Sequence, residues 1–484
     1  MTQTSKPVPH HNCLLESGDS ASERSERLNL VIVIIDSLRR DHVGAYGNDW
    51  ISTPSLDSLA VESARFANIY PEALPTLQVR QSTYTGNRLF PFNNHASKKG
   101  DFVRWPGWHQ VDERQVTLAE IMAHAGYRTG LVTDTYHQFK PSMNFHRGFQ
   151  QFTWIRGQEA DGYGSSSVMA NVDLSDVIHP AFPGTPREWA LRRYLANTRD
   201  RHYEEDYFAP QVFRAAMNFV EDNHRDDFLL VVDSFDPHEP WDPPPWYAEM
   251  YDPGYEGRNL IWPTYGDTDM LSAAELDHIR ANFAGEVTMV DRWLGRFVDK
   301  LRDLNVLDDT LLVVLSDHGM SLNERGVIGK YEEQIYPELT DIIMLIRDPS
   351  GTGAGQVVDE YAYDHDVLPT VLARLGLEPP LPVDGIDLAP AIAGGSTGRD
   401  YVTCCFGQYL QYQAPDWWYI TRRDGSEPRL YDRAADPDLR TNIAASEPER
   451  CAEIYARLEA DAGGEFSEIT PSQLRREGEW YHQA

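Results

Sequence analysis

Continuous apolar runs recur along the chain, and most of them end in a carboxylate or a histidine. A run rich in β-branched residues is typical of a strand that is buried on both faces. The pattern predicts strands within residues 28–36, 127–134, 228–233, 310–316 and 341–347. Each of these runs is too short to span a bilayer.

Between the strands, apolar residues recur every third or fourth position, which predicts amphipathic helices. The predicted helices lie at 55–66, with Ser55 as a candidate N-cap, at 117–125 before a glycine stop, and at 273–304. Strands that alternate with helices predict an α/β fold, with a large mixed, mostly parallel sheet sandwiched by helices.

The pattern changes near residue 395. Residues 417–433 predict two short strands around an Asp-Gly turn, and residues 448–462 predict a terminal helix. We therefore expect residues 27–395 to form an α/β domain and residues 396–484 to form a small subdomain of antiparallel sheet plus helix. Residues 1–26 are polar and lack periodicity, so we expect a disordered tail.

The net charge of the chain excludes some classes of binding partner. The 484 residues include 43 Lys and Arg against 75 Asp and Glu, a formal net charge of −32. This balance argues against binding to nucleic acid or to an anionic membrane. It leaves a small anionic substrate possible, because a local basic pocket can dominate the field in a cleft.

Cysteine usage bears on the compartment. The four cysteines are widely spread and form neither a disulfide framework nor a CxxC metal motif: Cys13, Cys404, Cys405 and Cys451. The first 29 residues contain no apolar core of signal-peptide length. We expect a reduced, cytoplasmic protein. Cys404 and Cys405 are expected to point to opposite faces if their segment is a strand.

Chemistry-bearing residues follow three of the predicted strands. Asp36 ends the first, residues 233–238 (DSFDPH) end the third, and Asp317 with His318 end the fourth. Ligands of parallel sheets gather at the carboxyl ends of the strands. One such carboxylate alone would be read as a helix cap, but three ends that carry Asp and His together favour a metal or catalytic site.

Six segments in this order resemble the sulfatase branch of the alkaline phosphatase superfamily. The resemblance runs from Leu28 to Ala445, and each motif is weak alone but specific in combination. The segments are VIVIIDSLRRDHVGAYG (31–47), STPSLDSLAVESARFANIY (52–70), PTLQVRQSTYTG (75–86), LVVLSDHG (312–319), ERGVIGK (324–330) and PRLYDRAADPDLRTNIA (428–444). The resemblance implies an alkaline phosphatase-like fold.

One position departs from the sulfatase pattern. Sulfatases carry Cys-x-Pro-Ser-Arg, whose cysteine is oxidised to formylglycine, whereas this chain has Thr76 at the cysteine position and retains Arg80. Threonine cannot form formylglycine. Its presence resembles phosphate-handling relatives such as nucleotide pyrophosphatase/phosphodiesterases, phosphopentomutases and phosphoethanolamine transferases. A threonine hydroxyl is a poor nucleophile unless a metal lowers its pKa.

The resemblance implies a metal site and a set of catalytic residues. The metal ligands would be Asp36, Thr76, Asp317 and His318. One divalent ion per chain is expected, and the imidazole favours zinc or manganese over calcium.

The remaining implied roles concern the transferred and leaving groups. Arg80 and Lys330 would contact the negative oxygens of the transferred group, and His238 would protonate the leaving group. For Lys330 the alternative is a solvated charge, and for His238 it is packing on Trp241. His137 is equally consistent with a catalytic or a structural role.

A second metal is the less favoured alternative. Two-metal relatives use an Asp-x-x-x-His pair and a later histidine, and the spacing of the available residues does not match that pair: Asp233, Asp236, His238 and His365.

The sequence thus predicts a metal-dependent hydrolase of phosphodiesters or phosphonate monoesters that forms a covalent intermediate on Thr76. Three alternatives stay open: a sulfate-ester hydrolase without formylglycine, a phosphoryl transferase, and a catalytically degenerate sulfatase fold that binds a partner. The expected partner is a small anionic ester. Homo-oligomers are common in sulfatase-like folds, so assembly is possible.

Overall fold

The centre of the computed structural model is an eight-stranded sheet in the order β12-β2-β11-β8-β1-β6-β4-β5. The structure describes residues 27–92, 106–139, 143–179, 186–466 and 469, so the predicted tail at 1–26 and Cys13 lie outside it. The strands of this sheet are β1 (Asn29–Ile35), β2 (Ala64–Phe66), β4 (Arg128–Thr133), β5 (Gln151–Trp154), β6 (Phe228–Ser234), β8 (Thr310–Ser316), β11 (Met344–Arg347) and β12 (Val357–Val358).

Strand register brings the predicted site residues to one edge of the sheet. β1 pairs in parallel with both β6 and β8, with Ile34 opposite Asp233 and Ile35 opposite Ser316. Asp36 and Asp317, each the next residue in its strand's path, therefore emerge beside Asp233. β11 runs antiparallel to β8 and β2, which makes the sheet mixed but mostly parallel, as predicted.

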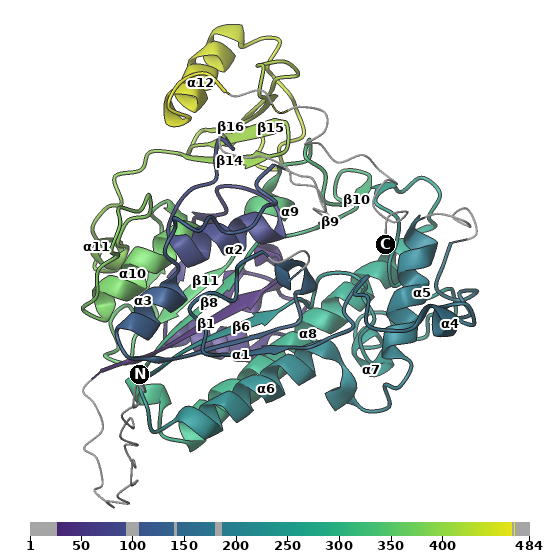
Figure 1. Ribbon diagram of the computed structural model, residues 1–484. Coiled ribbons are helices and arrows are strands. Elements are labelled where there is room, and N and C mark those ends of the chain that lie inside the picture. The colour runs from purple at the N-terminus through teal and green to yellow at the C-terminus, as the bar shows by residue number, and fades with distance from the viewer. Residues whose placement is uncertain (1–26, 93–105, 140–142, 180–185, 467–468, 470–484) are drawn as a thin grey trace, which may run out of the picture.

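Helices cover both faces of the sheet (Figure 1). Side chains of β1 alternate between two cores: Val31, Val33 and Ile35 pack on one face, and Leu30, Ile32 and Ile34 on the other. The first face is covered by α1 (Pro54–Val61), α6 (Phe208–Asn223) and α8 (Ala273–Asp303), and the second by α2 (Thr76–Thr85), α3 (Leu118–His124) and α10 (Val367–Arg374).

Shorter elements complete the α/β part of the chain. They are the helices α4 (Ser166–Met169), α5 (Pro186–Thr198), α7 (Pro245–Ala248), α9 (Pro337–Thr340) and α11 (Ala389–Ile392), and the strands β3 (Ile69–Tyr70), β7 (Gly266–Asp267), β9 (Ser321–Leu322), β10 (Val327–Gly329) and β13 (Ala362–Tyr363). β7, β10 and β9 form a small separate sheet.

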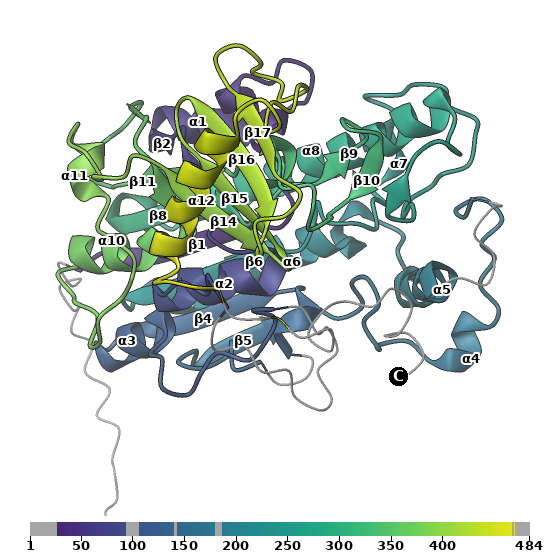
Figure 2. The ribbon, with the colours of Figure 1, turned by 90° about the horizontal axis from the view of Figure 1, so that it is seen from above.

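The C-terminal part forms an antiparallel sheet of β14 (Val402–Phe406), β15 (Tyr409–Gln413), β16 (Trp417–Arg422) and β17 (Arg429–Asp432), followed by α12 (Pro448–Asp461). Figure 2 shows α12 lying across this sheet. Cys404 packs with Leu74 on the face toward α2, and Cys405 packs with Ile454 of α12 on the other. The two cysteines therefore point to opposite faces, as predicted. The domain boundary at residue 395 stays a prediction.

The prediction for residues 55–66 was wrong at both ends. The helix α1 begins at Pro54, whose missing N–H costs nothing at the first helical position. Ser55 lies inside the helix, and its backbone N–H donates to Asp291 of α8. Residues 64–66 leave the helix and join the large sheet as β2. Among the helices in the described part of the chain, none has the length and apolarity that a membrane span needs.

Candidate metal and catalytic site

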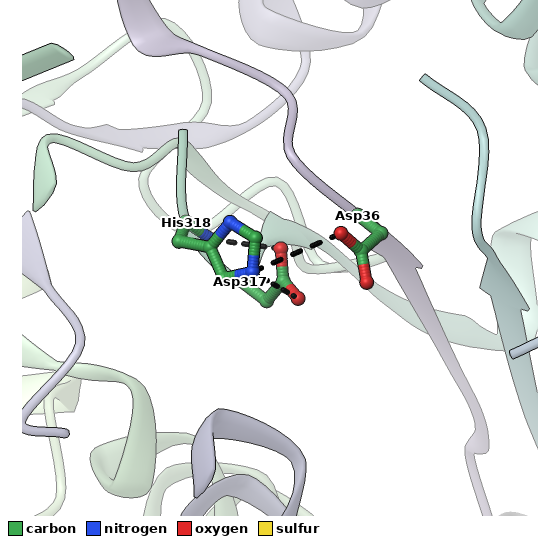
Figure 3. Close-up of side chains that lie close together, drawn as sticks. All are labelled: Asp36, Asp317 and His318. Atoms are coloured by element: carbon green, nitrogen blue, oxygen red, sulfur yellow. Dashed lines mark hydrogen bonds and ion pairs between the residues drawn. The ribbon is translucent and has the colours of Figure 1, made fainter. Parts of the chain in front are cut away.

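Asp36, Asp317 and His318 form a compact cluster at the carboxyl edge of the large sheet (Figure 3). All three side chains are fully buried. His318 Nε2 lies 3.8 Å from Asp36 Oδ1 and 3.5 Å from Asp317 Oδ2. Two carboxylates and one imidazole with ligand atoms within 4.8 Å of one another can hold a divalent metal ion.

The imidazole of His318 is set up as a ligand by its neighbour. Its Nδ1 lies 3.0 Å from the carbonyl oxygen of Gly319, so the Nδ1–H tautomer donates there and Nε2 presents its lone pair to the cluster. Burial lowers the pKa of His318 to about 4, which keeps the ring neutral at physiological pH.

The two carboxylates differ in protonation. Burial, followed by the charge of Asp317, raises the pKa of Asp36 well above its usual value. Burial acts on Asp317 in the same direction, but His318 and Arg80 hold the pKa of Asp317 below its usual range. Asp36 Oδ2 is buried and accepts no hydrogen bond from the described residues, although Arg80 Nη2 lies 3.1 Å away. An under-coordinated buried carboxylate oxygen fits a metal ligand.

Ser37 supports both carboxylates, a role that the sequence analysis missed. Its N–H donates to Asp317 Oδ1 at 2.9 Å, and its hydroxyl donates to Asp36 Oδ1 at 2.9 Å. The residue has a φ of 59°, a left-handed conformation that non-glycine residues rarely adopt. The only sequence signal was its place directly after Asp36.

Thr76 is the first residue of α2. Its Oγ1 lies 3.3 Å from His318 Nε2. The preceding segment is anchored by the C-terminal sheet, because Leu74 N donates to the carbonyl of Cys405 at 2.9 Å. Free N–H groups and the dipole at this helix end favour an anion. Thr76 is not the N-cap, since Pro75 holds that position.

Arg80 lies one turn beyond Thr76, and its guanidinium is fully buried among carboxylates. It forms a two-pronged pair with Asp233, at 2.8 Å from Nε and 2.7 Å from Nη2, and Nη1 lies 2.6 Å from Asp317 Oδ2. Nη1 also donates to the carbonyl of Thr76 at 3.1 Å. These contacts tie the start of α2 to the cluster. Contact with a transferred group stays a prediction.

Asp233 is linked to the cluster by Arg80, and the spacing of residues in the sequence did not reveal this link. Besides the arginine it accepts hydrogen bonds from Gln138 Nε2 at 2.6 Å and from Thr135 Oγ1 at 3.3 Å. Because its carboxylate is surrounded by these donors, Asp233 holds Arg80 and does not belong to the metal cluster.

Lys330 and His238 form a second buried pair beside the cluster. Lys330 Nζ lies 2.6 Å from His238 Nε2 and 3.5 Å from Ser37 Oγ. His238 Nδ1 lies 2.8 Å from the carbonyl of Glu239, so Nδ1 carries the proton and Nε2 accepts from the lysine. Burial, then the charge of Lys330, lowers the pKa of His238 well below its usual value. Lys330 is thus buried rather than solvated, and the ring of His238 stacks on Phe235 rather than on Trp241.

The backbone before Lys330 requires glycine. Gly329 has a φ of +119°, and a Cβ there would lie 2.4 Å from Cγ of Tyr265. The absence of a side chain at this position leaves room for the ring of Tyr265.

His137 pairs with a carboxylate, Glu159, whose role the sequence did not reveal. His137 Nε2 lies 3.0 Å from Glu159 Oε2, and the hydroxyl of Tyr136 donates to the same oxygen at 2.7 Å. Burial would raise the pKa of Glu159, but hydrogen bonding and the charge of His137 lower it to about 2. The ring of His137 also meets Trp108 edge-on at 5.0 Å.

Two residues weighed for a second metal lie elsewhere. Asp236 accepts from Gln158 Nε2 at 2.7 Å and from Ala209 N at 3.0 Å. His365 is buried against Tyr363 in the turn η6 (Asp364–Asp366). Within the described ranges, the one group of three suitable side chains is Asp36, Asp317 and His318.

Comparison with known proteins identifies the family. The sulfatase family model matches residues 28–377, so the chain belongs to the sulfatase family. An arylsulfatase of Clostridium perfringens is 26% identical over 87% of this chain and 90% of its own length. The multifunctional alkaline phosphatase superfamily protein PehA of Trinickia caryophylli is 24% identical over 76% of this chain and 78% of its own.

A solved structure confirms the alkaline phosphatase-like fold. The phosphonate monoester hydrolase of Agrobacterium radiobacter superposes with a TM-score of 0.69 at 21% identity, covering 90% of this chain and 96% of that one. The chain is therefore a hydrolase of ester bonds from the sulfatase family, with a candidate divalent-metal site at Asp36, Asp317 and His318.

Proposed function

We propose that the protein hydrolyses phosphodiesters or phosphonate monoesters, with Thr76 as the nucleophile. The observation that carries the proposal is the position of the Thr76 hydroxyl, 3.3 Å from His318 Nε2 at the start of α2. A residue that cannot become formylglycine thus occupies the place beside the cluster. The phosphonate monoester hydrolases among the similar structures support this substrate class.

Asp36, Asp317 and His318 would hold one divalent ion, with Thr76 completing the set. Zinc or manganese suits the imidazole better than calcium does. When bound, the ion would lower the pKa of the threonine hydroxyl and offset the negative charge of the ester oxygens.

The chain's own residues then supply the remaining steps. Thr76 Oγ, having lost its proton to solvent, forms a bond to phosphorus as the bond to the leaving oxygen breaks. The leaving oxygen takes a proton from the Lys330–His238 pair, in which the lysine carries it. Water then attacks phosphorus, breaks the bond to Oγ and restores the hydroxyl. Arg80 and Asp233 keep the first turn of α2 in register with the cluster.

A sulfate-ester hydrolase is the second candidate, because relatives named as sulfatases recur among the matches. A sulfate monoester carries one negative charge, as a phosphodiester does, and could enter the same site.

The free thiols of Cys404, Cys405 and Cys451 support a cytoplasmic setting, which stays a prediction.

A substrate panel on purified protein tests the proposal. Metal content is measured first, and then turnover of an aryl phosphodiester, phosphonate monoester, phosphomonoester and sulfate ester, with and without the metal found. We expect Thr76→Ala to lower diester turnover at least about a thousandfold. The matched control is Thr85→Ala, which removes a buried hydroxyl from the far end of the same helix.

The outcomes separate the candidates. Diester turnover that depends on Thr76 and not on Thr85 supports the proposal. Turnover of the sulfate ester above that of the diester favours the second candidate. Full diester activity in Thr76→Ala rules out this nucleophile.

A further inference from the structure

A small cavity lies between residues 177–179, the start of α5 and residues 260–271, which include β7. Its volume is about 20 Å³. Apolar side chains form much of its wall, and five of the residues that line it carry side-chain hydrogen-bond donors: His179, Arg187, Trp262, Thr264 and Thr268. A volume of this size holds about one water-sized atom or group.

Two of these donors are buried and have no acceptor in the part of the chain that the structure describes. Trp262 is 2% exposed, and its indole Nε1 finds no acceptor among the described residues. The hydroxyl of Thr264 is likewise buried and unpaired within that part of the chain. A buried donor without an acceptor costs about 1–3 kcal/mol, so such groups normally have a partner.

Arg187 adds a positive charge to the same cavity. Its guanidinium lies 4.3 Å over the ring of Trp262 and 5.3 Å over that of Tyr265. No carboxylate of the described residues pairs with it, whereas the neighbouring Arg192 pairs with Glu188. Asp267, which is exposed, also lines the cavity but does not reach ion-pair distance.

We propose that this cavity binds a small anion. The indole N–H and the guanidinium can only donate, and the threonine hydroxyl can donate as well. The volume limits the occupant to a halide ion or to one oxygen of a carboxylate or sulfate group. That oxygen could belong to a free oxyanion or to a second anionic group on the substrate. The proposal that the substrate supplies it rests on the proposed function.

A chain of side-chain contacts connects the cavity to the candidate active site. The ring of Tyr265 lies under Arg187, and its hydroxyl donates to Glu239. Glu239 in turn faces His238 Nδ1 at 3.3 Å. Two side chains, Tyr265 and Glu239, thus connect Arg187 at the cavity to the Lys330–His238 pair.

Crystallography of the metal-loaded protein tests the site without any need for activity. Crystals are soaked in bromide or in selenate, whose anomalous scattering locates the ion. We expect a peak in the cavity in the wild-type protein and a loss of affinity of about tenfold or more in Trp262→Phe, which removes one charge-assisted hydrogen bond. Thr264→Val is the second variant, because it preserves the side-chain shape.

Trp154→Phe is the matched control. Its indole Nε1 is also buried and finds no acceptor among the described residues, and Arg156 lies 4.1 Å over its ring, but Trp154 does not line the cavity. Its crystals should keep the peak. A peak that is as strong in both cavity variants as in the wild-type protein contradicts the proposal, and so does the absence of a peak with both ions.

Kinetics then identify the source of the anion. Aryl esters with and without a carboxylate on the non-leaving part are compared in the wild-type and Trp262→Phe proteins. If the substrate supplies the anion, the variant raises KM about tenfold for the carboxylate-bearing ester alone. A bromide peak with no such difference assigns the site to a free halide. A protein that turns over neither ester overturns the proposed function and leaves the soaking result to decide the anion site.

Discussion

The guanidinium of Arg80 holds the carboxylates of the candidate site in place. It contacts Asp36, Asp233 and Asp317, all of which are fully buried. A buried charge cluster of this kind is held by mutual neutralisation, and the loss of one partner leaves the others without compensation. Arg80 therefore ties the structural carboxylate Asp233 to the carboxylates of the proposed metal site.

Replacement of Arg80 by alanine should lower the free energy of unfolding by about 3–5 kcal/mol, because three carboxylates lose their buried counter-charge. Urea denaturation measures the effect. Arg80→Lys keeps the charge but cannot reproduce the two-pronged contact with Asp233. Arg114→Ala, which removes an exposed arginine, serves as the control and should stay within about 0.5 kcal/mol of the wild-type protein. Equal unfolding midpoints for Arg80→Ala and the wild-type protein would contradict this account.

His365 gives a pH dependence that is separate from the candidate metal site. Burial lowers its pKa to about 3 in the folded protein, against an unfolded value of about 6.5. Between these values the unfolded state binds the extra proton, so stability falls as pH falls. From about pH 6.5 to about pH 5, the wild-type protein should lose about 1.5 kcal/mol relative to His365→Gln.

Unfolding free energies at the two pH values test this difference. His124→Gln is the control, because His124 is exposed on α3 and its environment changes little on unfolding. A gap between wild type and His365→Gln that does not change with pH would show that folding does not shift the pKa of His365.

Part of the candidate site could be predicted from the sequence. Asp36, Asp317 and His318 could be predicted because each follows a buried strand, and parallel pairing brings strand ends together. Ser37 could not, because its role depends on a left-handed backbone conformation. The link from Arg80 to Asp233 likewise depends on which strand lies beside β1, and sequence spacing does not specify that order.

At the scale of elements, two contacts between distant segments position the helix that carries Thr76 and the helix that follows β1. The C-terminal sheet bonds to Leu74 just before α2, and α8 supplies the hydrogen bonds at the start of α1. Periodicity predicted α1 and the long helix α8, but it gave no prediction for α2. It misplaced the start of α1 because the group that satisfies its first N–H donors comes from Asp291, 235 positions beyond Leu56.

Asp291→Ala should lower the free energy of unfolding by about 1–3 kcal/mol, because the backbone N–H groups of Ser55 and Leu56 lose their acceptors. Chemical denaturation measures the change. Asp299→Ala removes an exposed aspartate of the same helix and should have little effect. Equal losses in the two variants would mean that Asp291 does not cap α1.

At the scale of the whole molecule, a bound metal ion should couple folding to the candidate site. A ligand that binds only the folded state raises Tm. We expect chelation to lower Tm of the purified protein, and zinc or manganese to restore it. The restoration should be lost in Asp36→Asn and retained in Asp222→Asn, which alters an exposed carboxylate of α6. A Tm shift that survives in Asp36→Asn would place the metal elsewhere.

The central claim is that Thr76 forms a covalent bond to phosphorus. The metal-loaded protein is mixed with an aryl phosphodiester, quenched in acid within the first turnover, and examined by peptide mass spectrometry. The account predicts that the peptide containing Thr76 carries the non-leaving half of the diester. Turnover of the diester without any adduct, or with the adduct on another residue, would contradict it.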